Sequence, residues 1–194
     1  MFVRTRKNRA PVLWALRVKS AMYILSKDID SLSYEESKRR FSEYKEYLET
    51  IKGKLSFFPI NFIFEEWYTD IASHKCIHDS WLDKVLISED DENKVTITLK
   101  LLGAYHDGFI TLKYSDVQYY KLNRNESSTI KSSHGDLRYE EFRLDEDGNQ
   151  IHEFDWYTLD ENAAFLIACR HIEYIWEEIP FDKKVKRKAE WKTN

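Results

Sequence analysis

Alternation of apolar and polar side chains between residues 76 and 177 is the feature that most constrains the fold. In the clearest case, residues 95–101, two threonines and a lysine separate four aliphatic side chains, which is the period of a strand with one buried face. Turn-forming sequences interrupt the alternation at 90–93, 106–108 and 147–149. The pattern predicts seven strands, at 81–87, 95–101, 109–114, 117–122, 137–144, 151–157 and 165–176.

Helical periodicity precedes these strands. Residues 11–26 and 33–52 place apolar side chains at steps of three and four. A further short helix is predicted after Pro59, although the pattern of residues 55–75 also fits an extended segment. Helices followed by strands, rather than alternating with them, indicate an α+β fold with an antiparallel sheet. We therefore expect N-terminal helices packed on a largely antiparallel sheet of about seven strands.

The predicted helix at 33–52 has the clearest local signals. Ser33 and Glu36 form a capping box at its start, and Gly53 suits the cap at its end. Tyr47 falls outside the apolar stripe, on the face expected to be solvated. The stripe expected to face the core comprises Tyr34, Phe41, Tyr44, Leu48 and Ile51.

Charge is distributed unevenly along the chain. The net charge is -4, yet residues 1–20 hold six bases and no acid, residues 136–161 have a net charge of -8, and residues 182–194 have a net charge of +4. We expect one compact unit with a helical region at 1–75, a β-rich region at 76–180 and a basic tail at 181–194. The basic ends carry no base-reading motif, so a nucleic-acid partner is not expected.

The expected cellular location follows from the lack of membrane-spanning and signal-peptide patterns in the sequence. No apolar run is long enough to span a membrane, and the run at 10–16 is broken by Arg17 and Lys19 without the cleavage pattern of a signal peptide. Two cysteines do not indicate a disulfide-rich secreted scaffold. We therefore expect a cytoplasmic protein of bacterial type that does not associate with membranes.

Two Cys-x-His pairs are the candidate metal ligands: Cys76 with His78, and Cys169 with His171. Residues two apart in a strand point the same way, so two such pairs on neighbouring strands would form a tetrahedral zinc site. The loop spacing of common zinc modules is absent. The alternative is that both cysteines pack as small apolar side chains beside ordinary polar histidines.

The same residues bear on catalysis. A metal-dependent or small-molecule-processing enzyme built on the His/Cys cluster is the alternative function, but no nucleophile elbow, phosphate-binding loop or dinucleotide fingerprint accompanies it. The dipeptide His78-Asp79 also has a structural interpretation, in which one of the two side chains binds backbone where the chain enters the sheet.

Acidic and aromatic side chains intermix between residues 136 and 157. Acids would steer a basic partner towards this hairpin and aromatic rings would anchor it. The alternative is an edge hairpin that its charges merely keep soluble. Alternation also predicts that Phe154 shares the environment of Trp156, whereas Tyr157 does not. The candidate contact residues are Asp136, Tyr139, Glu140, Glu141 and Trp156.

Three segments carry a resemblance: 77–81 (Ile-His-Asp-Ser-Trp), 135–142 (Gly-Asp-Leu-Arg-Tyr-Glu-Glu-Phe) and 175–177 (Ile-Trp-Glu). This pattern, within residues 76–177, resembles uncharacterised proteins of Gram-positive and related bacteria that are grouped as domains of unknown function. Some proteins of that kind are encoded near polymorphic toxins and are suspected immunity proteins. The resemblance transfers no catalytic residue. With the acidic hairpin, it predicts a non-catalytic protein-binding module with a basic partner, and immunity to a toxin as its role.

Overall fold

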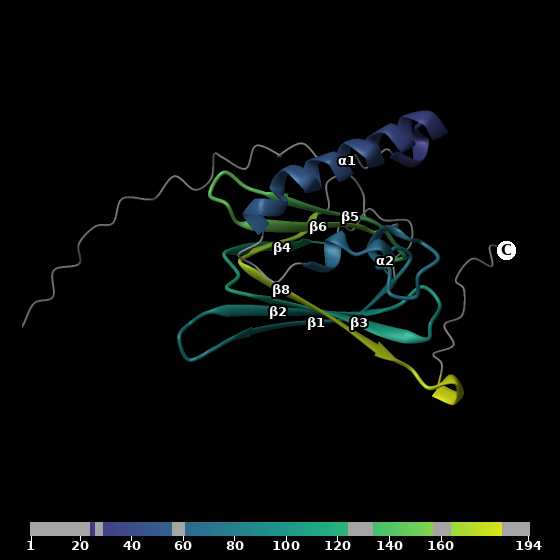
Figure 1. The fold of residues 1–194 in the computed structure, drawn as a ribbon. Coiled ribbons are helices and arrows are strands. Elements are labelled where there is room, and N and C mark those ends of the chain that lie inside the picture. Colours follow the sequence, from purple (N-terminus) through teal and green to yellow (C-terminus); the bar gives the residue numbers. More distant parts are fainter. Residues whose placement is uncertain (1–23, 26–28, 56–60, 124–133, 157–163, 184–194) are drawn as a thin grey trace, which may run out of the picture.

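The computed structural model describes residues 24–25, 29–55, 61–123, 134–156 and 164–183. Two four-stranded antiparallel sheets pack face to face, and the longest helix lies over one of them (Figure 1). Sheet A has the order β1 (Trp81–Glu89), β2 (Val95–Leu102), β3 (Gly108–Ser115), β8 (His171–Glu178). Sheet B has the order β4 (Tyr119–Asn123), β7 (Ala164–Cys169), β6 (Gln150–Trp156), β5 (Leu137–Leu144).

The predicted α+β class and the antiparallel pairing are confirmed, but the single sheet of seven strands is wrong. The predicted strand at 165–176 divides at Arg170 into β7 and β8, which belong to different sheets. The partner ribbon bends opposite this point, where Asp116 adopts a positive φ of 54° between β3 and β4. Arg170 Nε lies 3.9 Å from Asp116 Oδ2. One bent ribbon therefore runs through both sheets and joins them at a corner.

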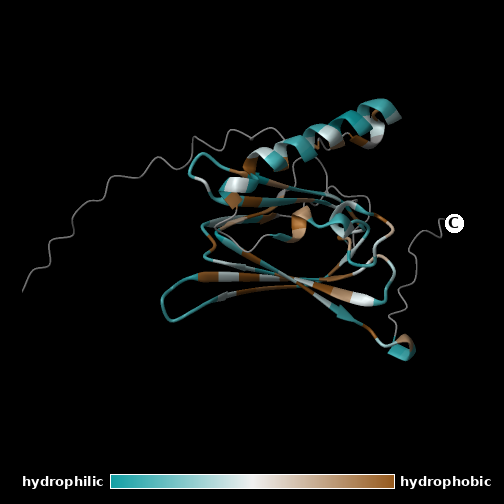
Figure 2. Ribbon diagram, viewed as in Figure 1, coloured by the Kyte–Doolittle hydropathy of each residue, from teal (hydrophilic) through white to brown (hydrophobic). Residues whose placement is uncertain are grey.

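The core lies between the two sheets. The aliphatic side chains predicted from residues 95–101 are confirmed, because Ile97, Leu99 and Leu101 are fully buried. Sheet B contributes mainly aromatic rings, among them Phe154 and Phe165, whose centroids are 5.5 Å apart. Figure 2 shows apolar residues concentrated on the strands, whereas the long helix is mostly hydrophilic. Alternation therefore identified which face of each strand is buried, but it did not show that these faces belong to two sheets with the core between them.

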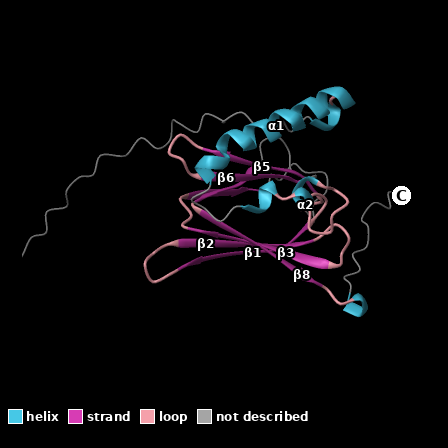
Figure 3. Ribbon diagram, viewed as in Figure 1, coloured by secondary structure: helices cyan, strands magenta, loops and turns pink. Residues whose placement is uncertain are grey.

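The helical segments are shown in Figure 3. Helix α1 (Tyr34–Leu55) begins one residue after Ser33, whose Oγ accepts the Glu36 backbone N–H at 3.3 Å, which confirms the Ser33 half of the predicted capping box. The carboxylate of Glu36 pairs with Arg39 instead. The helix continues through Gly53, so that residue is not its cap. The short helix predicted after Pro59 is a 3₁₀ turn, η2 (Asn61–Phe64), followed by the one-turn helix α2 (Glu66–Thr69). Two further 3₁₀ turns are η1 (Ile29–Ser31) and η3 (Phe181–Lys183).

Only part of the predicted helical stripe is buried. Tyr44, Leu48 and Ile51 are buried, and Leu55 continues the same face. Tyr34 is 77% exposed and Phe41 is 38% exposed, so the first turns of α1 do not face the core. The predicted helix at 11–26 lies outside the described residues, except for Ile24 and Leu25. No helix within the described ranges is long and apolar enough to cross a membrane.

Candidate functional site

Cys76 and His78 both bind backbone rather than each other. The Cys76 thiol donates to the carbonyl of Tyr68 at 3.3 Å, and His78 Nδ1 lies 2.6 Å from the carbonyl oxygen of Arg138. The second contact confirms the structural interpretation of the His78-Asp79 dipeptide. Burial raises the pKa of Cys76 to about 11, so this thiol is protonated near neutral pH and is a poor nucleophile.

Cys169 and His171 are separated by the bend at Arg170. Cys169 is fully buried on β7, where burial raises its pKa to about 12, whereas His171 is exposed at the start of β8. Within the described part of the chain, no group of three or more His, Cys, Asp or Glu side chains is placed to hold a metal ion. The predicted Cys₂His₂ quartet therefore has no geometric support.

The proposed contact residues of the β5–β6 hairpin do not form one surface. Trp156 and Glu141 have no exposed area, so neither is available to a partner. Asp136, Tyr139 and Glu140 are half-buried. Phe154 is buried like Trp156, as alternation predicted, and Tyr157 lies outside the described residues.

Arginines neutralise much of the acidity of this hairpin internally. Arg138 Nη2 lies 2.8 Å from Asp155 Oδ2, and Arg143 pairs with Glu153 while its Nη1 lies 3.6 Å from Glu141 Oε1. Charges that are paired and buried do not attract a partner at long range. The strands of this hairpin therefore give no support to the predicted acidic docking face, which stays a prediction. The exposed acids of the hairpin are Glu146 and Asp147, in the turn.

Glu141 ties the beginning of the described chain to β5. Its Oε2 accepts the backbone N–H of Leu25 at 2.8 Å. Burial raises the pKa of Glu141 to about 7, because desolvation outweighs the favourable contacts with backbone N–H groups and Arg143. Burial also raises the pKa of the neighbouring Glu140 to about 6. These carboxylates support the fold and are not free recognition groups.

The outer edge of β5 is closed by helix α1. The hydroxyl of Tyr44 accepts the backbone N–H of Phe142 at 2.7 Å, and the hydroxyl of Tyr47 accepts that of Leu144 at 3.0 Å. Two hydroxyls three residues apart on the helix thus satisfy two donors two residues apart on the strand. Tyr47 is half-buried by this contact, which corrects its expected place on the solvated face.

The beginning of β5 is closed by the segment that enters β1. The Asp79 N–H donates to the Leu137 carbonyl at 2.8 Å, and the Leu137 N–H donates to the Ser80 carbonyl at 2.9 Å. These bonds, with the contact of His78 to Arg138, complete the coverage that α1 provides further along the strand. The edge of β5 is therefore not open for pairing.

Two other edges carry features that discourage pairing. The register of β1 shifts between Leu82 and Lys84, which places a bulge and a lysine near the start of the edge. Strand β4 has only five residues and includes Lys121. Bulges, lysines and short length are the usual means by which a protein protects an exposed strand edge.

The edge of β8 has none of these features. Its eight residues pair with β3 in an unbroken register from Gly108↔Glu178 to Ser115↔His171, and β3 is its one strand neighbour among the described strands. The bond from Ile179 N–H to the Asp107 carbonyl continues this register. Bonded pairs alternate along an antiparallel ladder. The backbone polar groups of Ile172, Tyr174 and Trp176 therefore point away from β3, towards the free edge.

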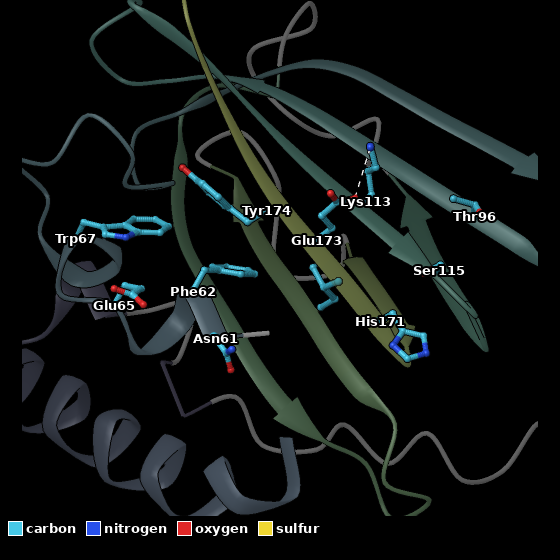
Figure 4. A pocket seen from close by; sticks show the side chains of 11 residues that line it. Asn61, Phe62, Glu65, Trp67, Thr96, Lys113, Ser115, His171, Glu173 and Tyr174 are labelled. Carbon is cyan, nitrogen blue, oxygen red and sulfur yellow. Dashed lines mark ion pairs between the residues drawn. The ribbon is translucent and has the colours of Figure 1, made fainter. Parts of the chain in front are cut away.

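A groove of about 770 Å³ lies along the first half of this edge (Figure 4). Its other wall is η2 and α2, where Phe62 and Trp67 place their ring centroids 5.1 Å and 4.8 Å from that of Tyr174. The Tyr174 hydroxyl donates to the Lys75 carbonyl at 2.6 Å, which fixes the ring. The lining residues are Asn61, Phe62, Glu65, Trp67, Thr96, Lys113, Ser115, His171, Ile172, Glu173 and Tyr174.

Sequence reasoning identified one lining residue of this groove, His171, and assigned it to metal binding. The aromatic wall at 61–69 lies in a segment whose periodicity fitted either a helix or a strand, and β8 was merged with β7 because no turn-forming residue separates them. The positive φ needed on the partner ribbon falls on Asp116, and aspartate tolerates that conformation. That residue was the one local signal of the bend.

Comparison with known proteins adds no assignment. Searches against protein-family models, curated proteins and solved structures find no match for this chain. No residue role is therefore transferred from another protein, and the open β8 edge with its groove is the candidate site on geometry alone.

Proposed function

We propose that this chain is a non-catalytic protein-binding module that pairs an extended segment of a partner with the free edge of β8. The observation that carries the proposal is the contrast among the four sheet edges. The edge of β5 is capped, β1 is bulged and carries a lysine, and β4 is short. Among the described strands, the regular edge of β8, beside a groove, is the remaining place where a partner strand can add.

Two kinds of contact would contribute to binding: backbone hydrogen bonds along the β8 edge and side-chain contacts with the aromatic rings of the groove. Each hydrogen bond to the outward groups of Ile172, Tyr174 or Trp176 contributes about 0.5–1.5 kcal/mol net, independent of the partner's sequence. Side chains that enter the groove contact Phe62, Trp67 and Tyr174, and aromatic residues in such pockets dominate binding energies. Selectivity for a partner would therefore come from the groove, and general strand affinity from the edge.

The two cysteines that suggested catalysis, and the buried His152, have structural roles, which supports a binding function. Both thiols are buried and protonated. His152 is buried beside the hydroxyl of Tyr114, 2.8 Å from its Nδ1, and burial lowers the pKa of His152 well below its usual value. A neutral, enclosed imidazole of this kind packs the core and does not reach a substrate.

Toxin neutralisation is the specific role implied by the sequence resemblance, and within this proposal a toxin would supply the added strand. Genomic context is the least costly discriminator. A gene for a secreted toxin beside this one favours an immunity protein, whereas a metabolic operon favours the alternative of a small-molecule enzyme.

The binding mode is tested by selecting peptides from a random display library on the full chain. Hydrogen exchange measured by NMR should show the amides of Ile172, Tyr174 and Trp176 protected at least about tenfold in the complex. Trp67→Ala should weaken binding about tenfold, as expected for an interface anchor. Leu86→Ala, which truncates an exposed side chain on the β1 edge, should change affinity less than about twofold. Protection on β1, or no protection on β8, would refute the proposal.

A further inference from the structure

We infer that the β8 edge selects a basic strand, with two cationic side chains four residues apart on one face and an apolar side chain between them on the other. This inference rests on the proposed function and specifies the chemistry of the partner. It follows from the distribution of charge around the groove and from the alternation of side chains along β8.

The two elements that enclose the groove are uniformly acidic. The segment 61–69 and strand β8 together carry Glu65, Glu66, Glu173, Glu177 and Glu178, and no lysine or arginine. Lys113, on β3, is the one lysine or arginine among the lining residues, and its Nζ lies 3.5 Å from Glu173 (Figure 4). All five glutamates are exposed, so their field reaches an approaching segment.

Alternation fixes where these charges lie relative to an added strand. Glu173 and Glu177 pair with Lys113 and Phe109 and lie on the face of sheet A that points away from sheet B. Tyr174, between them, lies on the opposite face, beside the aromatic wall of the groove formed by Phe62 and Trp67. A strand bound to this edge alternates in the same way. Its residues opposite Glu173 and Glu177 therefore face carboxylates, and its residue opposite Tyr174 faces the aromatic wall.

The contrast with the β1 edge indicates that this pattern is selective. Strand β1 mixes Asp83, Lys84 and Glu89, so it offers no field of one sign to an incoming strand. Strand β8 has Glu173 and Glu177 on its outer face, with His171 at the start of that face, and it carries no lysine or arginine. Like charges placed directly opposite on paired strands destabilise the pair, so an acidic segment would be rejected here.

The inference is tested with a synthetic peptide, acetyl-Ser-Lys-Val-Thr-Val-Lys-Ser-amide, and two analogues in which both lysines become glutamine or both become glutamate. Binding to the full chain is followed by fluorescence polarisation at several salt concentrations. The lysine peptide should bind about tenfold more tightly than the glutamine peptide, as two exposed ion pairs allow. This difference should shrink as salt rises, because exposed charges are screened over about 8 Å at physiological ionic strength.

Matched variants locate the effect. The double variant Glu173→Gln, Glu177→Gln should abolish the preference for lysine, and Glu89→Gln, an exposed acid at the end of β1, should leave it unchanged. Equal binding of the lysine and glutamine peptides to the wild-type chain would overturn the inference and leave the proposed function standing. Failure of all three peptides to bind would overturn both.

The chain's own basic segment is the competing occupant. Residues 184–194 carry five lysines and arginines against one acid, and they follow β8 in the sequence. If replacing Lys186, Arg187 and Lys188 by glutamine in the full chain raises affinity for the lysine peptide more than about threefold, the edge belongs to that segment, and the inference of a partner strand is overturned. Unchanged affinity is the result expected for a site reserved for a partner.

Discussion

Strands β5 and β8 have the same length, but the outer edge of β5 is covered by other elements whereas the outer edge of β8 is open. Both have eight residues and both end a four-stranded sheet. On β5, hydroxyls of Tyr44 and Tyr47 accept the outward N–H groups of Phe142 and Leu144. On β8, the outward groups face a groove instead. For these two strands, the difference between a closed and an open edge therefore comes from elements elsewhere in the chain, whereas β1 and β4 protect their edges with their own residues.

The comparison of β5 with β8 shows that exposed charges, rather than numerous charges, indicate where a partner can bind. The acids of the β5–β6 hairpin attract attention in the sequence, yet they pair with Arg138 and Arg143 inside the molecule. The glutamates of β8 are fewer and remain exposed. Loss of helix packing should therefore open the β5 edge, whereas changes on β8 should alter recognition with little effect on stability.

The largest effect is expected from substitutions that weaken the packing of α1, because this helix covers the edge of β5 and makes it different from the edge of β8. Leu48→Ala removes a buried side chain from the face of α1 that packs on the core, and should lower the free energy of unfolding by about 2–5 kcal/mol. Phe41→Ala, on a turn that is partly exposed, should cost about 1 kcal/mol, the value of its ring contact with Tyr139. Urea denaturation measures both. Equal losses would mean that the first turns of α1 are as firmly packed as the last.

Ionisation of Glu141, on β5, should make the free energy of unfolding depend on pH. The pKa is raised from 4.5 to about 7 in the folded protein, so the folded state binds more protons than the unfolded state between these values. Stability should accordingly fall by about 3 kcal/mol as the pH rises from about 4.5 to 7. Glu141→Gln should remove this part of the pH dependence and leave the smaller part that Glu140 contributes, because its pKa is raised to about 6.

The control for the pH effect is Glu146→Gln, an exposed acid in the β5–β6 turn. His152 acts in the opposite direction, because burial lowers its pKa and its protonation costs stability below its usual pKa of 6.5. The contribution of Glu141 is therefore the difference between the wild-type and Glu141→Gln curves. Parallel curves across this range would contradict the assignment.

Removing a single cap tests the closure of β5 directly. Tyr44→Phe leaves the buried N–H of Phe142 without its acceptor and should cost about 1–3 kcal/mol. Tyr47→Phe should cost less, because Leu144 is half-buried and water can replace the lost acceptor. In both variants the freed amide should exchange faster by NMR. A Tyr44→Phe protein with unchanged stability and exchange would show that the hydroxyl is not the cap.

The mildest test needs no substitution. In the unbound protein, the outward amides of Ile172, Tyr174 and Trp176 should exchange faster than the inward amides of Glu173 and Ile175. On β5, the outward amides of Phe142 and Leu144 should exchange slowly. Uniform protection along β8 would mean that its edge is already occupied in solution.

Much of the fold could be predicted from alternation and capping. The strands around 95–101 and 137–144 and the start of α1 at Ser33 follow from local periods and a local hydrogen bond. The division into two sheets could not be predicted, because alternation fixes which side chains share a face but not which strands pair. The bend at Arg170 lies within a nearly apolar run, where no turn-forming residue marks it.

The candidate site was harder to predict for a similar reason. A carboxylate such as Asp155, matched by an arginine on the adjacent strand, looks in sequence like a solvated charge. Phe62 and Trp67 become a groove wall only when β8 lies beside them. Both the ion pair of Asp155 and the groove wall depend on contacts between residues that are distant in sequence. Local sequence patterns do not show which distant residues come into contact.

The bent ribbon of β3–β4 and β8–β7 has a consequence for how the molecule forms. Because the ribbon runs through both sheets, neither sheet is an independent folding unit, and a single cooperative transition is expected. Strand β8 is the last strand in chain order among those described, and it pairs with β3 only after the intervening residues have been made. Such distant pairing is slow. During synthesis on the ribosome, the β8 edge therefore forms only after the other described strands have been made. A partner that pairs with this edge, as proposed above, would meet a chain whose two sheets are already able to close.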